Sequence, residues 1–532
     1  MFVRQKRVGG YTYLQLVENS RVEGRSRQRV VATLGRADVL EGKGGVDALL
    51  RSLGRFADKV EVQEAYAKGD LSALRERTVG PSLVFGRLWE ELGLREILKE
   101  KLARRRFSFP VERAVLASTV HRLFESGSDR QGYRFLRDVD VPEAEGLELH
   151  HLYRAMRFLG EEKDGIEEQL FARSRDLFTD LRLVFFDTTS LYFHGDGGKL
   201  GAHGHSRDHR PELKQVVVGA MLSGDGRPIS CEVYRGNQTD VRALLPVVDR
   251  ARERFNLSEV CFVADRGMVS SAVIKGLEER GLGYVLGMRL RRAKEVREAV
   301  LSHPGRYQVV ADNLQVKEVW VEDRRYIVCL NPEEAAKDKA DRELILEALE
   351  DKLAHGPKAL VGNRGFRRYL RVEKEAVKID PQKVKAEARF DGKWVLRTNT
   401  HLPASEVALQ YKRLLTVEQF FHAAKDLLET RPIFHKYQAT ITGHIFVSFL
   451  ALVLLNELSR RLERKGLKLE WADVLRDLGE VREVEIRHAQ KRYILRPPLK
   501  GVAGKVFKAA GVAIPPPARE DTRSAKTVVQ AP

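Results

Sequence analysis

Two aspartates stand directly after short apolar runs that have the composition of buried strands. Asp187 follows the run that begins at Leu183, and Asp265 follows the run that begins at Val260. Uninterrupted apolar runs indicate strands covered on both faces, and α/β sheets build their sites at the carboxyl ends of such strands. Two carboxylates brought together there repel each other unless a cation lies between them, and oxygen ligands favour Mg²⁺ or Mn²⁺. Taken singly, each aspartate is more simply explained by a turn or a helix cap.

A third acidic residue, Glu418, lies in a stretch with helical periodicity. Helical spacing places Glu418 and Lys425 two turns apart on one side of that helix. We expect Thr416 to cap the helix, with Gln419 completing a capping box. Glu418 either belongs to a solvated helix face or joins the two aspartates in a site for two metal ions roughly 3.5–4 Å apart. Such a site acts on phosphodiesters. The apolar stripe of the helix comprises Val417, Phe420, Phe421, Ala424, Leu427 and Leu428.

Composition restricts the class of protein. The 532 residues carry a formal net charge of +18, which favours a polyanionic partner, most simply nucleic acid. The three cysteines have no metal-ligand spacing and are expected to be reduced core thiols. The first residues lack the apolar core of a signal peptide, and the apolar run Ile445–Leu455 is too short to span a bilayer. We therefore expect a cytoplasmic protein.

The length requires several domains, and changes in periodicity suggest their boundaries. Alternating residues at 11–17 and 28–34 predict a small basic β-hairpin. Helices are expected after Leu83 and after Pro110, then over 149–159 and 166–178. The fold class is α/β, and from Pro515 we expect a disordered tail. The predicted regions are 1–80, hairpin and linker; 81–180, helical and DNA-binding; 181–290, first part of the catalytic core; 291–403, strand-rich insertion; 404–465, second part of the core; and 466–532, basic C-terminal region.

These residues resemble the signatures of DDE transposases of bacterial insertion sequences. The resemblance lies in the runs around Asp187 and Asp265 and in a Tyr-x2-Arg-x3-Glu-x6-Lys pattern, which Tyr411, Glu418 and Lys425 match. The arginine position of that pattern is occupied by Leu414, with Arg413 one residue earlier. The opening hairpin and three further segments also resemble this family. Those segments are 204–215, 236–240 and 431–435.

The resemblance implies a ribonuclease-H-like core and Mg²⁺- or Mn²⁺-dependent strand cleavage at transposon ends, followed by strand transfer. It implies that Asp187, Asp265 and Glu418 are the catalytic and metal-binding residues. Tyr411 and Lys425 would contact DNA phosphates. For Arg413 two possibilities stay open: it supplies the phosphate contact of the motif's arginine, or that contact is absent. A homodimer would synapse two transposon ends, with target DNA as a further partner, in the bacterial cytosol and associated with the nucleoid. Two alternatives stay open: a metal-dependent nuclease on the same core that cuts without joining, and a DNA-binding repressor of transposition without catalysis.

Two further groups of side chains admit more than one interpretation. His203, His205 and His209 suggest either a zinc site or a basic loop that faces DNA. Trp320 and Trp394 lie in the predicted insertion, where each either stacks on an unpaired base or is buried in a small local core.

Overall fold

The computed structural model describes residues 1–22, 25–42, 45, 46, 48, 65–174, 183–256, 260–355, 364–372, 377–488 and 491–521. The chain forms two compact units. Unit 1 comprises residues 1–76, 483–498 and 515–532, and unit 2 comprises residues 77–482 and 499–514.

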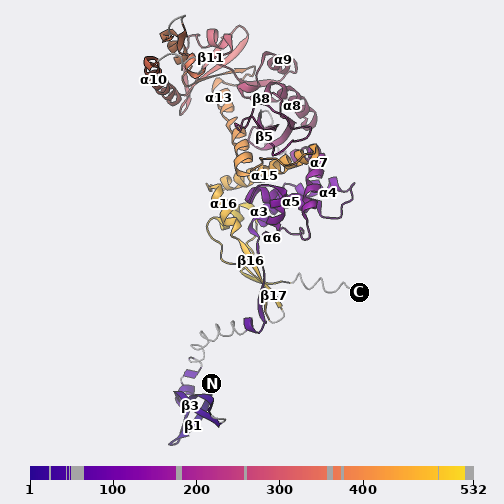
Figure 1. Cartoon of the computed structure of the whole chain (residues 1–532), viewed down its shortest axis with the longest axis vertical. Coiled ribbons are helices and arrows are strands. Elements are labelled where there is room, and N and C mark those ends of the chain that lie inside the picture. Colours follow the sequence, from indigo (N-terminus) through magenta and orange to yellow (C-terminus); the bar gives the residue numbers. More distant parts are fainter. Residues whose placement is uncertain are drawn as a thin grey trace. The chain divides into compact units, whose positions relative to one another are not determined.

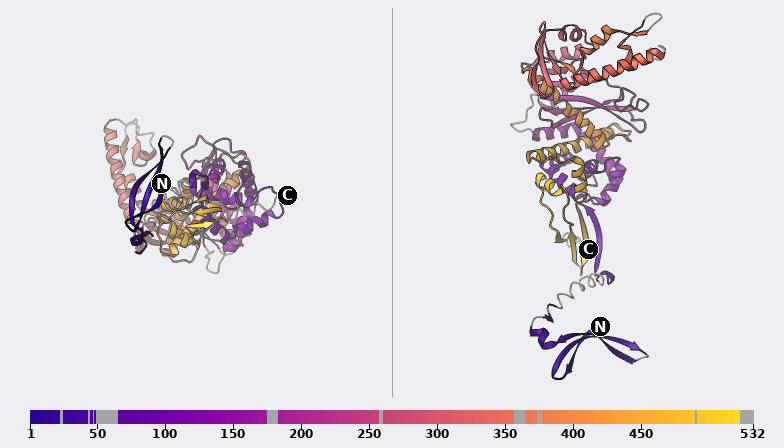
Figure 2. Two further views of the ribbon diagram at one scale, coloured as in Figure 1. Left: turned by 90° about the horizontal axis from the view of Figure 1, so that it is seen from below. Right: turned by 90° about the vertical axis from the view of Figure 1, so that its left-hand side faces the viewer.

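Unit 1 begins with a sheet of three antiparallel strands, where the sequence predicted a hairpin of two (Figure 2). Its strands are β1 (Phe2–Val8), β2 (Tyr11–Val22) and β3 (Arg25–Arg36), followed by the helix α1 (Ala37–Gly42). A second sheet has the order β18-β17-β16-β4. Its strands are β4 (Leu71–Thr78), β16 (Arg482–His488), β17 (Lys491–Leu495) and β18 (Ala518–Glu520). The prediction of a disordered tail from Pro515 is therefore wrong up to Asp521, and residues 522–532 lie outside the described part of the chain.

Unit 2 contains a helical layer. Its helices are α3 (Gly80–Glu91), α4 (Leu94–Leu102), α5 (Val111–Phe124), α6 (Asp129–Asp138), α7 (Leu149–Ser174), α15 (Gln438–Arg464), α16 (Trp471–Gly479) and α17 (Ala503–Ala510). The expected break between residues 159 and 166 does not occur, because α7 is continuous. Gly160 of α7 and Gly443 of α15 explain this: a Cβ at either would come within 1.9 Å of a carbonyl oxygen of the other helix. The two glycines let the helices pack at close range, and that packing outweighs their low helix propensity.

The helix α15 is long and apolar enough to cross a membrane by length and composition alone. However, 72% of its most apolar stretch is buried inside the protein. It is therefore the central core helix of unit 2, as its neighbours α5, α7 and α17 show.

A sheet of nine strands forms the other layer of unit 2, in the order β10-β11-β12-β15-β9-β8-β5-β6-β7 (Figure 1). Its strands are β5 (Leu183–Tyr192), β6 (Gln215–Ser223), β7 (Pro228–Arg235), β8 (Cys261–Ala264), β9 (Gly283–Gly287), β10 (Gln308–Ala311), β11 (Leu314–Val321), β12 (Arg324–Leu330) and β15 (Lys393–Thr398). β5, β8 and β9 are parallel, and the remaining pairs are antiparallel. β15 pairs with β9, so the strands of the predicted insertion extend this same sheet.

Helices cover both faces of the sheet around β5, and the alternation of side chains explains how. Val184 and Phe186 pack with α8 (Asp240–Phe255) and α9 (Ser271–Glu279). Leu183 and Phe185 face the opposite core, which includes α13 (Ala404–Lys412), α14 (Leu415–His422) and α15. The remaining elements are α10 (Pro332–His355), α11 (Arg364–Arg367), β13 (Leu370–Val372), β14 (Val377–Ile379), α12 (Pro381–Ala388) and the short helical turns η1 (Arg266–Met268), η2 (Val296–Val300) and η4 (Ala423–Leu427).

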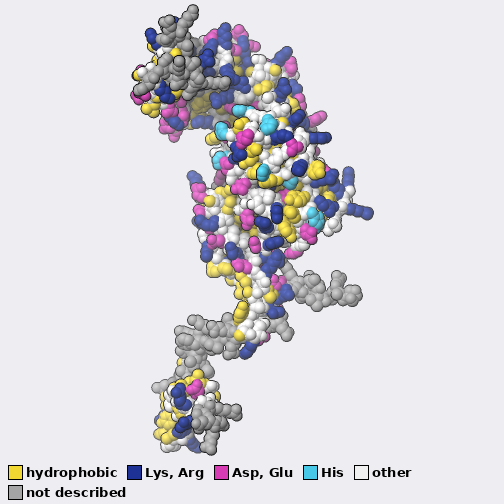
Figure 3. All heavy atoms as spheres, viewed as in Figure 1, with side chains coloured by type: hydrophobic (Ala, Val, Ile, Leu, Met, Phe, Trp, Pro, Cys, Tyr) yellow, Lys and Arg dark blue, Asp and Glu magenta, His cyan; other side chains and the backbone are white. Residues whose placement is uncertain are grey.

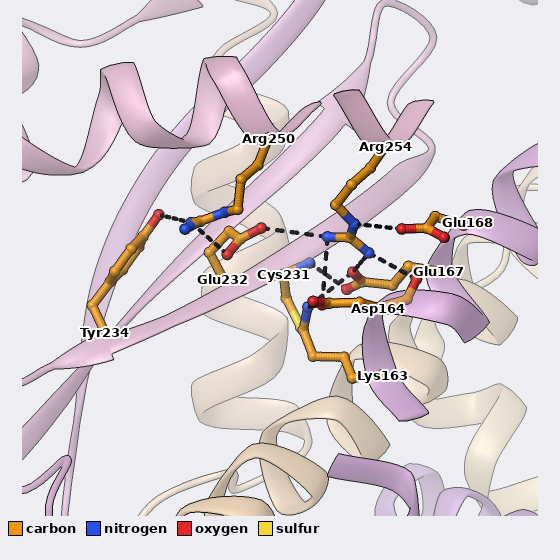
Figure 4. A network of polar contacts seen from close by, with 9 residues as sticks. All are labelled: Lys163, Asp164, Glu167, Glu168, Cys231, Glu232, Tyr234, Arg250 and Arg254. Atoms are coloured by element: carbon orange, nitrogen blue, oxygen red, sulfur yellow. Dashed lines mark hydrogen bonds and ion pairs between the residues drawn. The ribbon is translucent and has the colours of Figure 1, made fainter. Parts of the chain in front are cut away.

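A buried network of charges joins α7 to the edge strand β7 and to α8 (Figure 4). At its centre Glu167, which is fully buried, accepts hydrogen bonds of 2.9 Å from Lys163 Nζ, Arg254 Nη2 and the backbone N–H of Cys231. The last of these satisfies a donor on the edge of the sheet, which would otherwise lack a strand partner. The helical layer is thus fixed to the sheet through one carboxylate.

We expect Glu167→Gln to lower the free energy of unfolding by about 3 kcal/mol, because it removes the fully buried anion that Lys163 and Arg254 share. The carboxylates left to these cations are more exposed. Glu168→Gln is the matched control. Glu168 also bonds Arg254, at 2.8 Å, but its side chain is 41% exposed, so the cost should stay below about 1 kcal/mol. Urea unfolding followed by circular dichroism measures both. Equal losses for the two variants would contradict this account.

Candidate active site

The register between β5 and β8 brings Asp187 and Asp265 together. The two strands are parallel, and their last paired residues are Phe186 and Ala264, each followed by an aspartate. Asp265 follows the end of β8, as predicted. Asp187, in contrast, lies inside β5, because β5 continues to Tyr192 in antiparallel pairing with β6. The alternation along β5 directs Asp187 to the face that α13 and α14 cover.

Asp187 is a buried carboxylate in an acidic environment. It is 9% exposed, and its Oδ1 accepts a hydrogen bond of 2.7 Å from the backbone N–H of Thr188. Burial raises the pKa of Asp187 to about 7, and the neighbouring Asp265 and Asp240 contribute to the increase. The Arg207 guanidinium, 3.7 Å from Asp187 Oδ1, opposes it. The carboxylate therefore lies where a cation would be stabilised.

Asp240 is a further acidic residue of this site that the sequence analysis did not assign. It is the first residue of α8, and its Oδ1 accepts a hydrogen bond of 2.7 Å from Thr188 Oγ1. Its Oδ2 bonds Arg207 Nη2 at 2.8 Å. A Cβ at Gly267 would lie 3.5 Å from Asp240 Oδ2 and 3.9 Å from Asp265 Oδ2, so both carboxylates lie close to this glycine. The sequence signal was the family resemblance of segment 236–240, which ends at Asp240 but gave this residue no role.

Tyr411, on α13, contacts the site directly. Its hydroxyl donates a hydrogen bond of 2.9 Å to Asp265 Oδ1. Burial raises the pKa of Tyr411, and the charges of Asp265 and Glu418 raise it further. A Cβ at Gly287 would lie 2.3 Å from the hydroxyl oxygen, so only glycine leaves room for it. In this structure Tyr411 therefore holds Asp265.

Glu418 lies apart from the two aspartates. It is exposed on α14, where it lines a hollow of about 670 Å³ together with Leu455 and Trp471. Its negative charge contributes to the raised pKa of Tyr411. Across the described ranges, no three His, Cys, Asp or Glu side chains lie close enough to hold one metal ion. His203, His205 and His209 therefore form no zinc site in this structure. The predicted cap is also wrong: α14 begins at Leu415, with Leu414 at its N-cap and no side-chain capping bond.

The basic residues of the predicted motif have different partners. Lys425 lies in the π-helical turn η4, and its Nζ is 2.7 Å from Asp208 Oδ1. Arg413 donates a hydrogen bond of 3.4 Å to the carbonyl of Gly224.

The two tryptophans of the predicted insertion differ in exposure. Trp320 is 54% exposed, and its indole N–H donates a hydrogen bond to Glu318. Trp394 is partly buried against the main core.

Two family models match this chain. The N-terminal domain of IS1634 family transposases matches residues 2–65, and the transposase DDE domain matches residues 179–454, which is more than half of the chain. The chain belongs to the DDE transposases of insertion sequences. It is a DNA transposase.

The remaining comparisons give weaker likenesses. A piggyBac transposase in a synaptic complex with hairpin DNA is 12% identical, with a TM-score of 0.37 over 75% of this chain and 79% of the other. A Mos1 transposase in a paired-end complex is 14% identical, with a TM-score of 0.15 over 34% of this chain and 60% of the other. Among curated proteins, none matches this chain.

The donor set of the candidate site suits a divalent cation, but Asp187, Asp240 and Asp265 do not converge closely enough in this structure to hold one ion. Asp187, Asp240 and Asp265 offer only carboxylate oxygens, which suit Mg²⁺ and Mn²⁺. Arg207 partly compensates the charges of Asp187 and Asp240, and the Tyr411 hydroxyl donates a hydrogen bond to Asp265. DDE transposases in general use a divalent metal ion.

The raised pKa of Asp187 predicts how the stability of the transposase depends on pH. The folded protein keeps the Asp187 proton up to about pH 7, whereas the unfolded chain loses it near pH 3.8. The folded state therefore binds more protons in this window, and stability falls as the pH rises through it. Asp187→Asn removes this pH-dependent contribution to the free energy of unfolding. We expect its stability relative to wild type to increase by on the order of 2 kcal/mol from pH 5 to pH 8. Urea unfolding in EDTA measures this, and a pH-independent difference would contradict it.

Proposed function

We propose that this transposase cleaves DNA at the ends of an insertion sequence and joins the freed ends to target DNA, with Asp187, Asp265 and Glu418 as its catalytic residues. The observation that carries the proposal is the parallel register of β5 and β8. It sets two carboxylates side by side at the carboxyl end of β8, which is where α/β sheets build their sites. The mixed sheet, with helices on both faces, supports a ribonuclease-H-like core.

Asp187 and Asp265 would hold a divalent cation, Mg²⁺ or Mn²⁺, and we propose that Glu418 joins them when DNA is bound. The cation, once bound, supplies Lewis acidity to the attacking and leaving oxygens of a phosphodiester. Tyr411 orients the Asp265 carboxylate through its hydrogen bond. Arg207 partly compensates the charges of Asp187 and Asp240 before the substrate arrives.

Lys425 and Arg413 are proposed to contact DNA phosphates. On the face of unit 2 drawn in Figure 3, lysine and arginine side chains are interspersed with acidic ones and form no single basic patch. DNA affinity then depends on a few well-placed cations together with the net charge of +18. We further propose that the transposase acts as a homodimer on two DNA ends, in the bacterial cytosol.

We expect Asp187→Ala, Asp265→Ala and Glu418→Ala each to reduce strand cleavage by at least on the order of 10²–10³-fold, the magnitude for losing a preorganised electrostatic group. DNA binding should stay near that of wild type. The substrate is a labelled duplex that carries the DNA flanking the coding sequence, incubated with Mg²⁺ and a supercoiled target plasmid. Cleavage retained in Asp187→Ala would remove Asp187 from the proposal.

The same assay distinguishes transposase activity from the two alternatives. Products covalently joined to the plasmid require strand transfer, which a nuclease does not perform. Nicked ends without joined products would favour a nuclease. Binding of the flanking DNA without any cleavage by the wild type would favour a repressor of transposition.

A further inference from the structure

Asp208 lies among three cationic side chains next to the acidic site. Its Oδ1 is 2.7 Å from Lys425 Nζ and 3.5 Å from Arg431 Nε. The preceding residue, Arg207, contacts Asp187 and Asp240. The Asp208 side chain is only 7% exposed. One buried carboxylate is thus shared by two cations, with a third beside it.

The hydrogen bonding of this cluster is incomplete. Asp208 Oδ2 and Arg431 Nη1 are buried and have no hydrogen-bond partner among the described residues. Arg431 Nη2 does bond Asp426, at 3.1 Å, but that carboxylate is 49% exposed and is also 3.2 Å from His422. Burial lowers the pKa of Lys425, and Arg431 and Arg207 lower it further, against the effect of Asp208. Lys425 and Arg431 thus share the buried carboxylate of Asp208, and that carboxylate leaves Arg431 Nη1 unbonded.

We propose that Lys425 and Arg431 form a binding site for a DNA backbone phosphate, and that Asp208 occupies this site in the protein without DNA. The inference rests on the proposed function and deepens it. A phosphodiester has the same single negative charge as the carboxylate. It offers more acceptor oxygens, however, and so can bond the ammonium and the planar guanidinium at once. It would satisfy the Arg431 Nη1 donor that Asp208 leaves unbonded.

The chain connects this phosphate site to the acidic site. Asp208 and Arg207 are consecutive residues, so a phosphate that displaces the Asp208 carboxylate also moves the backbone that positions Arg207. The Arg207 guanidinium bonds the Thr188 backbone carbonyl and Asp240. Phosphate binding thereby loosens the cation that shields Asp187, and the acidic site becomes accessible when the DNA strand is in place.

A purely structural ion pair is the alternative, and it predicts the opposite sign. If Asp208 only anchors Lys425, its removal disorders the site and weakens DNA binding. If Asp208 competes with phosphate, its removal strengthens DNA binding, because the cations are then without a buried anion until DNA supplies one.

The experiment measures DNA affinity of the full-length chain in EDTA, so that no catalysis is required. The probe is a fluorescent 30-base-pair duplex of mixed sequence, titrated at several salt concentrations. We expect Asp208→Asn to bind about three- to tenfold more tightly than wild type. Arg431→Gln should bind more weakly, with the salt slope reduced by about 1.

Glu212→Gln is the matched control for net charge. Glu212 lies in the same loop and pairs with Arg210, but both side chains are at least half exposed and outside the cluster. Its affinity should rise far less than that of Asp208→Asn. Equal affinities for the two variants, or weaker binding by Asp208→Asn, would overturn the inference.

Two further readouts keep the test decisive. Circular dichroism melting shows whether each variant is folded. If Asp208→Asn does not fold, the test rests on folded Arg431→Gln. A DNA affinity and salt slope equal to those of wild type would then overturn the inference. Failure of the wild type to bind any duplex would instead count against the proposed function.

Discussion

The parallel register of β5 with β8 is the constraint on which the site depends. Side chains alternate along a strand, so a shift of one residue would turn Asp187 toward α8 and α9 and away from α13 and α14. The register is fixed by burial, because Val184 and Phe186 fill one core while Leu183 and Phe185 fill the other. The hydrophobic residues before the aspartate therefore determine where its carboxylate lies.

The same fold buries several charges, and the extent to which they are compensated differs between sites. Glu167 fixes α7 to β7 and α8 by accepting from two cations and one backbone N–H. Each of these three donors has its hydrogen bond to Glu167, so the role of this carboxylate is to hold the fold together. At the acidic site the compensation is partial: Arg207 approaches Asp187 only to 3.7 Å, and the pKa of Asp187 stays raised. Incomplete compensation of this kind is typical of functional sites, because the missing charge is the one that the substrate or cation brings.

The sequence predicted the parts of this site that depend on local patterns. Buried strands before Asp187 and Asp265 follow from apolar runs, and the helix of Glu418 follows from its periodicity. The length of β5 could not be predicted, because its second half is held by pairing with β6, which is distant in sequence. Arg207 and Asp240 lie in the family-like segments 204–215 and 236–240, but neither was assigned a role. One is a loop residue and the other begins a helix, and neither local context indicates that they meet. The C-terminal strands β16–β18 were missed because their segments are short and highly charged.

The interruption of the helix after His422 explains why a correct spacing led to a wrong geometry. In a continuous α-helix Glu418 and Lys425 would project from the same side, about 10 Å apart along the axis. Here α14 ends at His422, and the turn η4 closes with a bond from Leu428 N–H to the carbonyl of Ala423. A π turn contains an extra residue, so side chains within it and after it are rotated relative to those of a continuous α-helix. Lys425 consequently faces Asp208, while Glu418 stays exposed on α14. Glu418 and Lys425, the acid and the cation of one motif, thus have different surroundings. Because Lys425 pairs with Asp208, it does not neutralise the Glu418 carboxylate, which the proposed catalysis requires to be charged.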